Sequence, residues 1–156
     1  MESITDVGAG IERTYREEGA RLWRALFAQT GDPDLADDVV AEVFAQALAR
    51  GDAIADPRAW VWRSAFRIAM GRLKEARKVV ELVETSYELP ASTVDLVRAL
   101  ARLSPKQRAA IVLHHYAGYP TKEVAVLIGS TTAAVRVHLS IGRKRLRASL
   151  EDHDDG

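Results

Sequence analysis

The chain has 156 residues, no cysteine and a formal net charge of zero, with 47% apolar and 28% charged residues. This composition supports a buried core and excludes a disordered chain, a disulfide framework and thiolate zinc sites. The N-terminal residues lack the basic and apolar segments of a secretory signal. No apolar run approaches the roughly 20 residues that span a bilayer, so we expect a soluble, cytoplasmic protein without direct membrane insertion.

The zero net charge conceals alternating acidic and basic segments. Residues 32–42 contain five acids and no base, whereas residues 58–78 contain seven Lys or Arg and one acid. Residues 79–95 contain four acids and no base, and residues 105–150 contain eight Lys or Arg and one acid. A single charged segment is often merely solvated, but four in alternation favour separate surfaces, at least one of them for a polyanion.

Apolar residues recur at helical spacing throughout, without the alternation typical of strands, which predicts an all-α protein. The first half predicts three helices, at residues 15–27, 34–49 and 57–78. Asp34 is expected to cap the second helix, and Pro57 is expected to open the third. The apolar stripe of the second helix is expected to comprise Val39, Val40, Val43, Phe44, Ala47 and Leu48.

Three aromatic residues in the third predicted helix have two interpretations. Trp60, Trp62 and Phe66 can form a platform for unstacked bases. Trp62 and Phe66 share an i, i+4 face with Ala69, however, so a core position is favoured for all three.

The acidic stretch at residues 79–93 has weak periodicity and contains a proline, so we expect a linker there. It divides the chain into two small helical domains, at residues 10–78 and 94–150.

The second domain begins with clear helix signals. Leu96, Leu100 and Leu103 form one apolar stripe. Residues 104–107 (Ser-Pro-Lys-Gln) combine a Ser cap, Pro at the first helical position and Gln at the reciprocal capping position. Gly118 supplies a left-handed stop.

A helix-turn-helix pattern follows. A short helix at residues 121–128 leads to Gly129, which suits a tight turn because glycine tolerates positive φ, and Thr131 caps the last helix. The inner face of that helix comprises Val135, Leu139, Gly142, Leu146 and Leu150. The outer face comprises Ala133, Arg136, Val137, Ser140, Ile141, Lys144 and Arg147. Cations on such a face neutralise phosphates, and Arg also pairs with a guanine edge.

Two apolar residues interrupt this basic outer face. Val137 and Ile141 lie one helical turn apart. Contacts with thymine methyl groups, a small patch for a protein partner, and tolerated surface positions are all consistent with the sequence.

Two parts of the chain resemble domains of bacterial sigma factors. LSPKQRAAIVLHHYAGYPTKEVAVLIGSTTAAVRVHLSIGRKRLR resembles their C-terminal promoter-reading domain. ADDVVAEVFAQAL and ADPRAWVWRSAFRIAMGRLKEARK resemble their second domain. Two such domains joined by a short acidic linker are typical of the extracytoplasmic-function (ECF) class, and the resemblance covers roughly residues 10–150.

The resemblance implies three partners: core RNA polymerase, promoter DNA and an anti-sigma factor. Core polymerase would be bound at its clamp helices and flap. The second predicted helix would bind the clamp helices through Asp38, Glu42 and Gln46, which a helical wheel places on its outer face. The third would bind the downstream (minus-ten) element, while residues 51–56 receive an unstacked base. The linker would follow the RNA exit path.

The resemblance also assigns residues to the two promoter elements. The downstream set is Asp52, Arg63, Arg67, Arg72, Lys74, Arg77 and Lys78. The upstream (minus-thirty-five) set is Thr131, Thr132, Ala133, Arg136, Val137, Ser140, Arg143, Lys144 and Arg147.

Three positions depart from the family pattern. Ala41 stands where relatives often have Gln, and Arg67 stands where Asn is common, so downstream specificity does not transfer. Pro120 replaces the Ser that usually caps the short helix, which leaves Glu123 without its capping partner.

Alternative functions fit the sequence less well. A stand-alone helix-turn-helix regulator leaves the first domain unassigned, and a sigma-like regulator would use Val137 and Ile141 to bind a partner. An enzyme lacks support, because no nucleophile–base constellation or Gly-rich phosphate loop is present. His114 and His115 are adjacent and do not share a helix face, which disfavours a metal site. We expect a non-enzymatic protein without a cofactor, metal or small-molecule substrate.

Overall fold

The structure, a computed structural model, describes residues 4–75 and 89–154, and these contain helices and no strand. The expected all-α class is confirmed. The first segment forms α1 (Ile4–Thr30), α2 (Pro33–Arg50), the single turn η1 (Gly51–Ala53) and α3 (Pro57–Glu75). The second forms α4 (Ala91–Ala101), α5 (Pro105–Ile111), η3 (Val112–Tyr116), α6 (Thr121–Ile128) and α7 (Thr132–Asp154). We call residues 4–75 the first lobe and residues 89–154 the second lobe.

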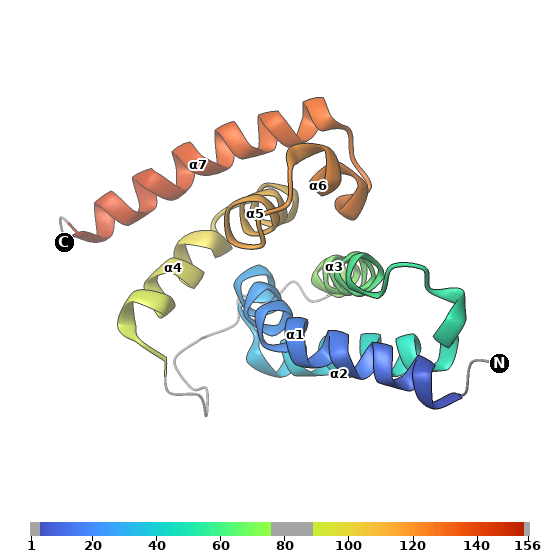
Figure 1. Ribbon diagram of the computed structural model, residues 1–156. Helices are drawn as coiled ribbons and strands as arrows, with labels where there is room; N and C mark the ends of the chain where they lie inside the picture. The colour runs from blue at the N-terminus through green and yellow to red at the C-terminus, as the bar shows by residue number, and fades with distance from the viewer. Residues whose placement is uncertain (1–3, 76–88, 155–156) are drawn as a thin grey trace.

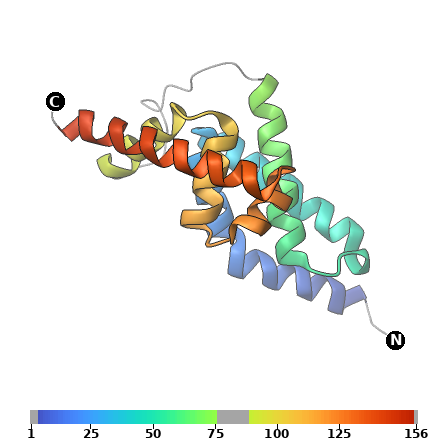
Figure 2. The same ribbon diagram turned by 90° about the horizontal axis from the view of Figure 1, so that it is seen from above.

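The two lobes pack directly against each other (Figure 1). Within the first lobe α1, α2 and α3 contact one another, and within the second lobe α7 packs on α5 and α6. Across the junction, α6 packs on α3, while α4, α5 and η3 pack on α1. From above, α7 forms the outermost layer of the second lobe (Figure 2). The buried apolar side chains of both lobes form one connected cluster, so the lobes share a core in this arrangement.

Some helix bounds differ from those expected. α2 is capped by Asp32, whose carboxylate accepts from the backbone N–H groups of Asp34 at 3.0 Å and Leu35 at 3.2 Å. The predicted cap, Asp34, is wrong, because Pro33 occupies the first helical position, where its missing N–H costs no hydrogen bond. α1 extends further toward the N-terminus than the apolar pattern predicted, and α4 begins at Ala91, inside the expected linker. The expected end of the third helix lies outside the described residues.

The local signals of the second lobe are confirmed. The Ser104 hydroxyl accepts from the Gln107 N–H, and the Gln107 carboxamide oxygen accepts from the Ser104 N–H, both at 3.2 Å. Gly118 and Gly129 have φ of 81° and 66°, respectively, in the left-handed region that glycine tolerates. Thr131 caps α7 by accepting from the Ala134 N–H at 3.1 Å. One feature was not predicted, the π-helical turn η3 between α5 and Gly118.

The aromatic residues of α3 lie mainly in the core. Trp62 and Phe66 are fully buried, as predicted. Trp60 is only half-buried, and the guanidinium carbon of Arg50 lies 5.5 Å from the centre of its ring. In α4, the expected apolar stripe is wrong at Leu96, which is 41% exposed, whereas Leu100 and Leu103 are buried.

Gly142 permits close packing of α7 on α5. A Cβ atom at this position would lie 3.1 Å from Cγ1 of Ile111 and 3.5 Å from the backbone oxygen of Gln107. The buried position of Gly142 agrees with its expected place on the inner face of α7.

We expect Gly142→Val to lower the free energy of unfolding by about 2 kcal/mol, because the added methyl groups overpack this interface. Gly71→Val, at an exposed position of α3 where an added Cβ atom would meet nothing within 4 Å, is the matched control for the change in helix propensity. Urea denaturation measures both. Equal stability of the two variants would contradict the close-packing role.

Candidate nucleic-acid interface

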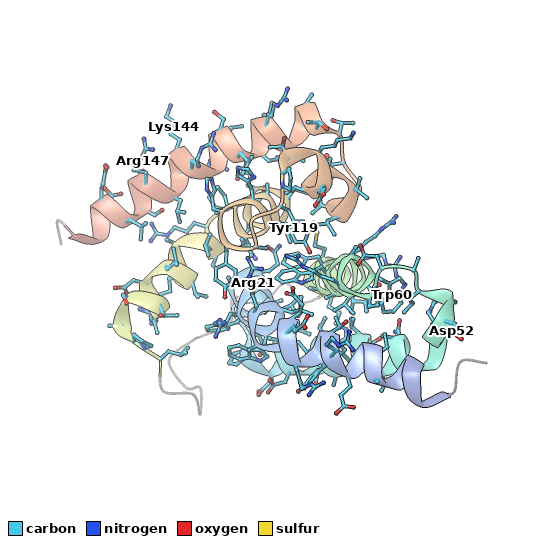
Figure 3. All side chains as sticks on the ribbon, viewed as in Figure 1. Arg21, Asp52, Trp60, Tyr119, Lys144 and Arg147 are labelled. Atoms are coloured by element: carbon cyan, nitrogen blue, oxygen red, sulfur yellow. The ribbon has the colours of Figure 1, made fainter. Side chains whose placement is uncertain are left out.

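The outer face of α7 is open to solvent. Its predicted upstream-element residues are exposed, apart from the half-buried Thr132: Thr131, Ala133, Arg136, Val137, Ser140, Arg143, Lys144 and Arg147. Lys144 and Arg147 point away from the rest of the molecule (Figure 3). No acid occurs between Thr132 and Leu150, so every charged side chain in this part of α7 is basic.

The helices of the helix-turn-helix are placed as that motif requires. α6 and α7 are bent by 100° at a short break, within the range of roughly 90–120° typical of the motif. Gly129 turns the chain with φ of 66° and ψ of 44°. At the start of α6, Pro120 makes no side-chain capping bond, as expected from its missing hydroxyl.

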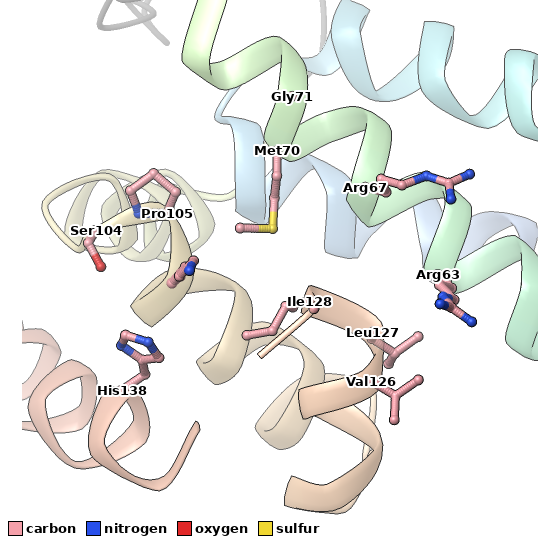
Figure 4. Close-up of a pocket in the computed structure, with 12 residues that line it drawn as sticks. Arg63, Arg67, Met70, Gly71, Ser104, Pro105, Val126, Leu127, Ile128 and His138 are labelled. Carbon is pink, nitrogen blue, oxygen red and sulfur yellow. The ribbon is translucent and has the colours of Figure 1, made fainter. Parts of the chain in front are cut away.

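Two arginines of α3 line a cleft between the lobes. Arg63 and Arg67 are exposed and border a cavity of 680 Å³ (Figure 4). α3 also contributes Met70, while the second lobe contributes apolar residues of α6 and the basic side chains of Lys106 and His138. Cations from both lobes therefore face one cleft, which the sequence did not predict.

A third arginine of α3 is engaged within the first lobe. Arg72 forms an ion pair with Glu42 of α2, whose carboxylate also accepts from Gln46 Nε2 at 3.4 Å. The helical wheel places Glu42 and Gln46 on the outer face of α2; in the structure both are half-buried, and Glu42 pairs with α3 through Arg72. The structure describes neither the Lys74 side chain nor Arg77 and Lys78, the other predicted downstream residues.

The exposed surface of α2 is more apolar than expected. Asp38 is exposed as predicted, and Leu48, which the apolar pattern assigned to the core stripe, is 56% exposed. Adjacent helical residues diverge by about 100°, so burial of Ala47 turns Leu48 outward. A groove of 740 Å³ between α1 and α2 is lined by Leu48, Ala45 and Tyr15, among others. No local signal distinguishes these residues from core residues.

The turn between α2 and α3 borders a second hollow at the junction. Asp52 is exposed on η1 (Figure 3). A cavity of 540 Å³ beside the turn is lined by Ile54 and Trp60 of the first lobe and by Tyr119 of the second, among others.

Side chains of the first lobe hold the second lobe in place. Arg21 Nη2 donates to the backbone oxygens of Ala117 at 2.8 Å and Tyr116 at 3.2 Å. Arg24 Nε donates to the Tyr116 hydroxyl at 2.8 Å. These bonds join residues more than 90 positions apart in the chain.

Tyr119 anchors the junction from the second lobe (Figure 3). Its buried ring packs edge-on against Trp62 with centroids 5.8 Å apart, and the Arg58 guanidinium lies 5.7 Å from its centre. Arg58 also pairs with Glu18 at 2.8 Å, and Glu18 accepts from Trp62 Nε1 at 3.2 Å. Burial raises the pKa of Tyr119, although Arg58 acts in the opposite direction.

Arg108 connects both lobes through backbone carbonyls. Its guanidinium donates to Leu100 at 2.9 Å and Leu103 at 3.0 Å, near the C-terminal end of α4, and also to Gln29 at the end of α1. The Gln29 side chain returns a bond to the Pro105 oxygen at 3.0 Å. Burial lowers the pKa of Arg108.

The two adjacent histidines lie in different surroundings. Nδ1 of His114 lies 2.8 Å from the Tyr119 backbone oxygen, whereas His115 is exposed. Partial burial lowers the pKa of His115, with smaller contributions from His114 and Arg143. Within residues 4–75 and 89–154, no three His, Cys, Asp or Glu side chains gather as a metal site.

No single helix among the described residues is long and apolar enough to cross a membrane; only the bent pair of α6 and α7 passes by length and composition taken together.

One protein family matches the second lobe, and individual relatives match most of the chain. The family described as Sigma-70, region 4 matches residues 93–146. The ECF RNA polymerase sigma factor SigL of Mycobacterium tuberculosis is 31% identical over 154 residues, covering 88% of this chain and 87% of that protein. The RNA polymerase sigma-E factor of Streptomyces antibioticus is 30% identical over 160 residues, covering 92% of this chain and 86% of that protein.

Solved structures share the fold. CnrH in complex with the cytosolic domain of CnrY matches with a TM-score of 0.73 at 24% identity, over 96% of this chain and 95% of that chain. The sigma factor RpoE of Bartonella quintana, in complex with the anti-sigma factor NepR, matches with a TM-score of 0.68 at 22% identity, over 87% and 95%. Together with the full-length sequence similarity to SigL and the sigma-E factor, the two-lobed helical fold shows that this chain belongs to the ECF sigma factors of bacterial RNA polymerase.

Proposed function

We propose that the protein binds core RNA polymerase and directs it to promoters, using a separate surface of each lobe for each promoter element. The outer face of α7 carries the proposal. It follows a helix-turn-helix bend, is exposed, and has only basic charged side chains between Thr132 and Leu150. A recognition helix enters the major groove with its N-terminal residues on base edges. We assign the contacts with base edges to the first turns of α7, and the contacts with phosphates to Arg143, Lys144 and Arg147.

The downstream element is assigned to α3 and the turn before it. Arg63 and Arg67 are exposed and free to neutralise phosphates of the melted strand, and Asp52 borders the turn proposed to receive an unstacked base. Lys74, Arg77 and Lys78 extend the same basic sequence. Arg72 is better assigned to positioning α3 on α2, because it already pairs with Glu42.

Binding of core polymerase is assigned to the exposed surface of α2. Asp38 supplies negative charge for a basic partner, and the neighbouring groove supplies apolar area around Leu48 and Tyr15. Glu42 and Gln46 flank this surface from the side of α3. The protein performs no catalytic step of its own in this proposal, and it acts where the polymerase does, in the cytoplasm.

An anti-sigma factor is a further proposed partner. RpoE, a protein of the same fold, has been solved in complex with the anti-sigma factor NepR, and CnrH, also of this fold, with the cytosolic domain of CnrY. The cleft between the lobes is lined by cationic and apolar side chains, which suits an acidic, partly apolar segment of a partner protein.

The proposed function requires the lobes to separate. The centres of elements at minus ten and minus thirty-five lie about 85 Å apart on straight duplex DNA at 3.4 Å per base pair. In this structure α3 and α6, which belong to the two reading units, are in contact. The 13 residues from 76 to 88 span at most about 45 Å when extended, enough to let two lobes move apart. The packed arrangement is therefore assigned to the protein before promoter binding.

Run-off transcription over a genomic promoter library, with purified core polymerase and this protein, tests the proposal and returns the recognised sequences. We expect transcription to depend on the protein. Failure to bind core polymerase, combined with binding of duplex DNA by the protein alone, would instead establish a stand-alone regulator.

A single substitution tests the assignment of α7. We expect Arg136→Ala to weaken holoenzyme binding to a cognate promoter about tenfold, the loss of a base or phosphate contact worth ~1–3 kcal/mol. Binding to core polymerase is expected to stay unchanged in a competition assay. Arg13→Ala, at an exposed position of α1, is the matched control. Loss of polymerase binding by Arg136→Ala would contradict the division between the surfaces.

A further inference from the structure

We infer that Val137 and Ile141 read thymine methyl groups of the upstream promoter element, a specificity role that rests on the proposed function of α7. The inference concerns which bases the helix selects, and not whether it binds DNA.

The position of Val137 on α7 is the first support. The inner face is defined by Val135 and Leu139, both buried in the core. At 100° per residue, Val137 lies about 180° from the mean direction of these two residues. It is 55% exposed, on the line of α7 that points furthest from the second lobe. In a recognition helix, that line faces the floor of the major groove.

Ile141 extends the same apolar surface. It lies one turn further along α7 and is 38% exposed. Four residues of α-helix rise about 6 Å, close to two base-pair steps of duplex DNA. Val137 and Ile141 are therefore spaced to meet two bases about two steps apart, on the same strand or on opposite strands.

The charges around the pair identify nucleic acid as the occupant. Arg136, Lys144 and Arg147 lie on the same outer face of α7 as the two apolar side chains and are exposed, and no acid lies on this part of the helix. In the major groove, the thymine methyl is the apolar group among polar base edges, and phosphates line the groove. An apolar site within a cationic surface is complementary to this arrangement. The cavities between α1 and α2 and between the lobes do not include either side chain.

The size of the effect follows from the buried group. Covering one methyl-sized group contributes the equivalent of about a fourfold change in affinity. Each of the two side chains is therefore expected to favour thymine over a base without the methyl by about fourfold, and the two contributions are expected to add if the positions are independent.

The experiment removes the methyl from the DNA and the side chain from the protein. Holoenzyme first selects duplexes from a pool randomised only in the upstream element. Each thymine of a selected duplex is then replaced, one at a time, by deoxyuridine, which lacks only the methyl group. Competition binding compares the wild-type protein with Val137→Ala, Ile141→Ala and the control Leu96→Ala, which removes another exposed apolar side chain of the second lobe.

We expect deoxyuridine at one or two positions to weaken binding of the wild-type protein about fourfold each. Val137→Ala is expected to lose this sensitivity at one position and Ile141→Ala at the other, while Leu96→Ala keeps both. Equal binding of thymine and deoxyuridine duplexes at every position would overturn the inference, as would unchanged sensitivity in both alanine variants.

The same measurements separate this inference from the proposed function. If the holoenzyme selects no upstream sequence and Arg136→Ala binds as tightly as the wild type, the assignment of α7 to DNA fails. If Arg136→Ala weakens binding but methyl removal has no effect, only the reading of thymine fails. Loss of a co-purified protein partner from Val137→Ala, without any change in DNA binding, would assign the pair to a protein contact instead.

Discussion

We expect Arg108→Met to lower the free energy of unfolding by about 3 kcal/mol, a large fraction of the stability of a small protein. Methionine fills a similar volume but donates no hydrogen bond. The backbone oxygens of Leu100, Leu103 and Gln29 then lose their charged donor in a buried site. Each unpaired buried carbonyl costs about 1–3 kcal/mol, and partial access of water reduces the sum.

The matched control is Lys106→Met, which removes an exposed cation from the same helix. We expect this control to change the free energy of unfolding by less than 0.5 kcal/mol, the typical range for surface substitutions. Urea denaturation at pH 7 measures both variants. A loss below about 1 kcal/mol for Arg108→Met would mean that water replaces the guanidinium, and that Arg108 does not join the lobes.

We expect Arg21→Ala to raise the population of separated lobes roughly 30-fold. Arg21 donates two bonds from α1 to the backbone oxygens of Tyr116 and Ala117, across the junction. Charge-assisted bonds of this kind contribute about 2 kcal/mol in total, and only the packed arrangement loses them. A difference of 1.36 kcal/mol corresponds to a factor of ten in population.

The absence of cysteine makes the lobes easy to label. Ala59→Cys on α3 and Lys122→Cys on α6 introduce two exposed positions on facing helices, and a pair of spin labels there reports the distribution of distances. We expect a short distance in the free protein, a long one in the holoenzyme, and a larger long-distance fraction after Arg21→Ala. Arg13→Ala, on the same helix, is expected to behave as the parent protein.

Separation of the lobes also has a functional readout. A protein whose binding-competent state is rarely populated binds with an affinity reduced by that fraction. If promoter binding needs separated lobes, Arg21→Ala should strengthen binding to a two-element promoter duplex, by up to the same factor. A short distance retained in the promoter-bound holoenzyme would show that the packed arrangement is the active one.

Local chemistry explains why much of the second lobe was predictable. The Ser104–Gln107 box, the left-handed Gly129 and the Thr131 cap each involve atoms within a few residues of one another. Such interactions form whatever the rest of the chain does, so the sequence alone indicates them. The outer face of α7 was predicted for the same reason, because helical period assigns faces once the buried residues are known.

Errors arose where two local options compete. Asp32 and Asp34 are both good caps, and the choice was made by Pro33, which is best tolerated at the first helical position. Leu48 fitted the apolar stripe of α2 but faces solvent, because the core accommodates only one residue of each adjacent pair at that end of the helix.

The sequence by itself determined the all-helical class, the helix-turn-helix, the basic face of α7 and the resemblance to ECF sigma factors. Only the tertiary structure decided that Arg72 pairs with Glu42, that Arg21 and Arg108 join the lobes, and that Arg63 faces a cleft shared with the second lobe. The reason is separation along the chain. Arg72 and Glu42 are 30 residues apart, and Arg21 and Ala117 are 96 apart, so no local pattern relates them. Whether a cation faces solvent, DNA or a carbonyl of another helix is decided by how the helices pack.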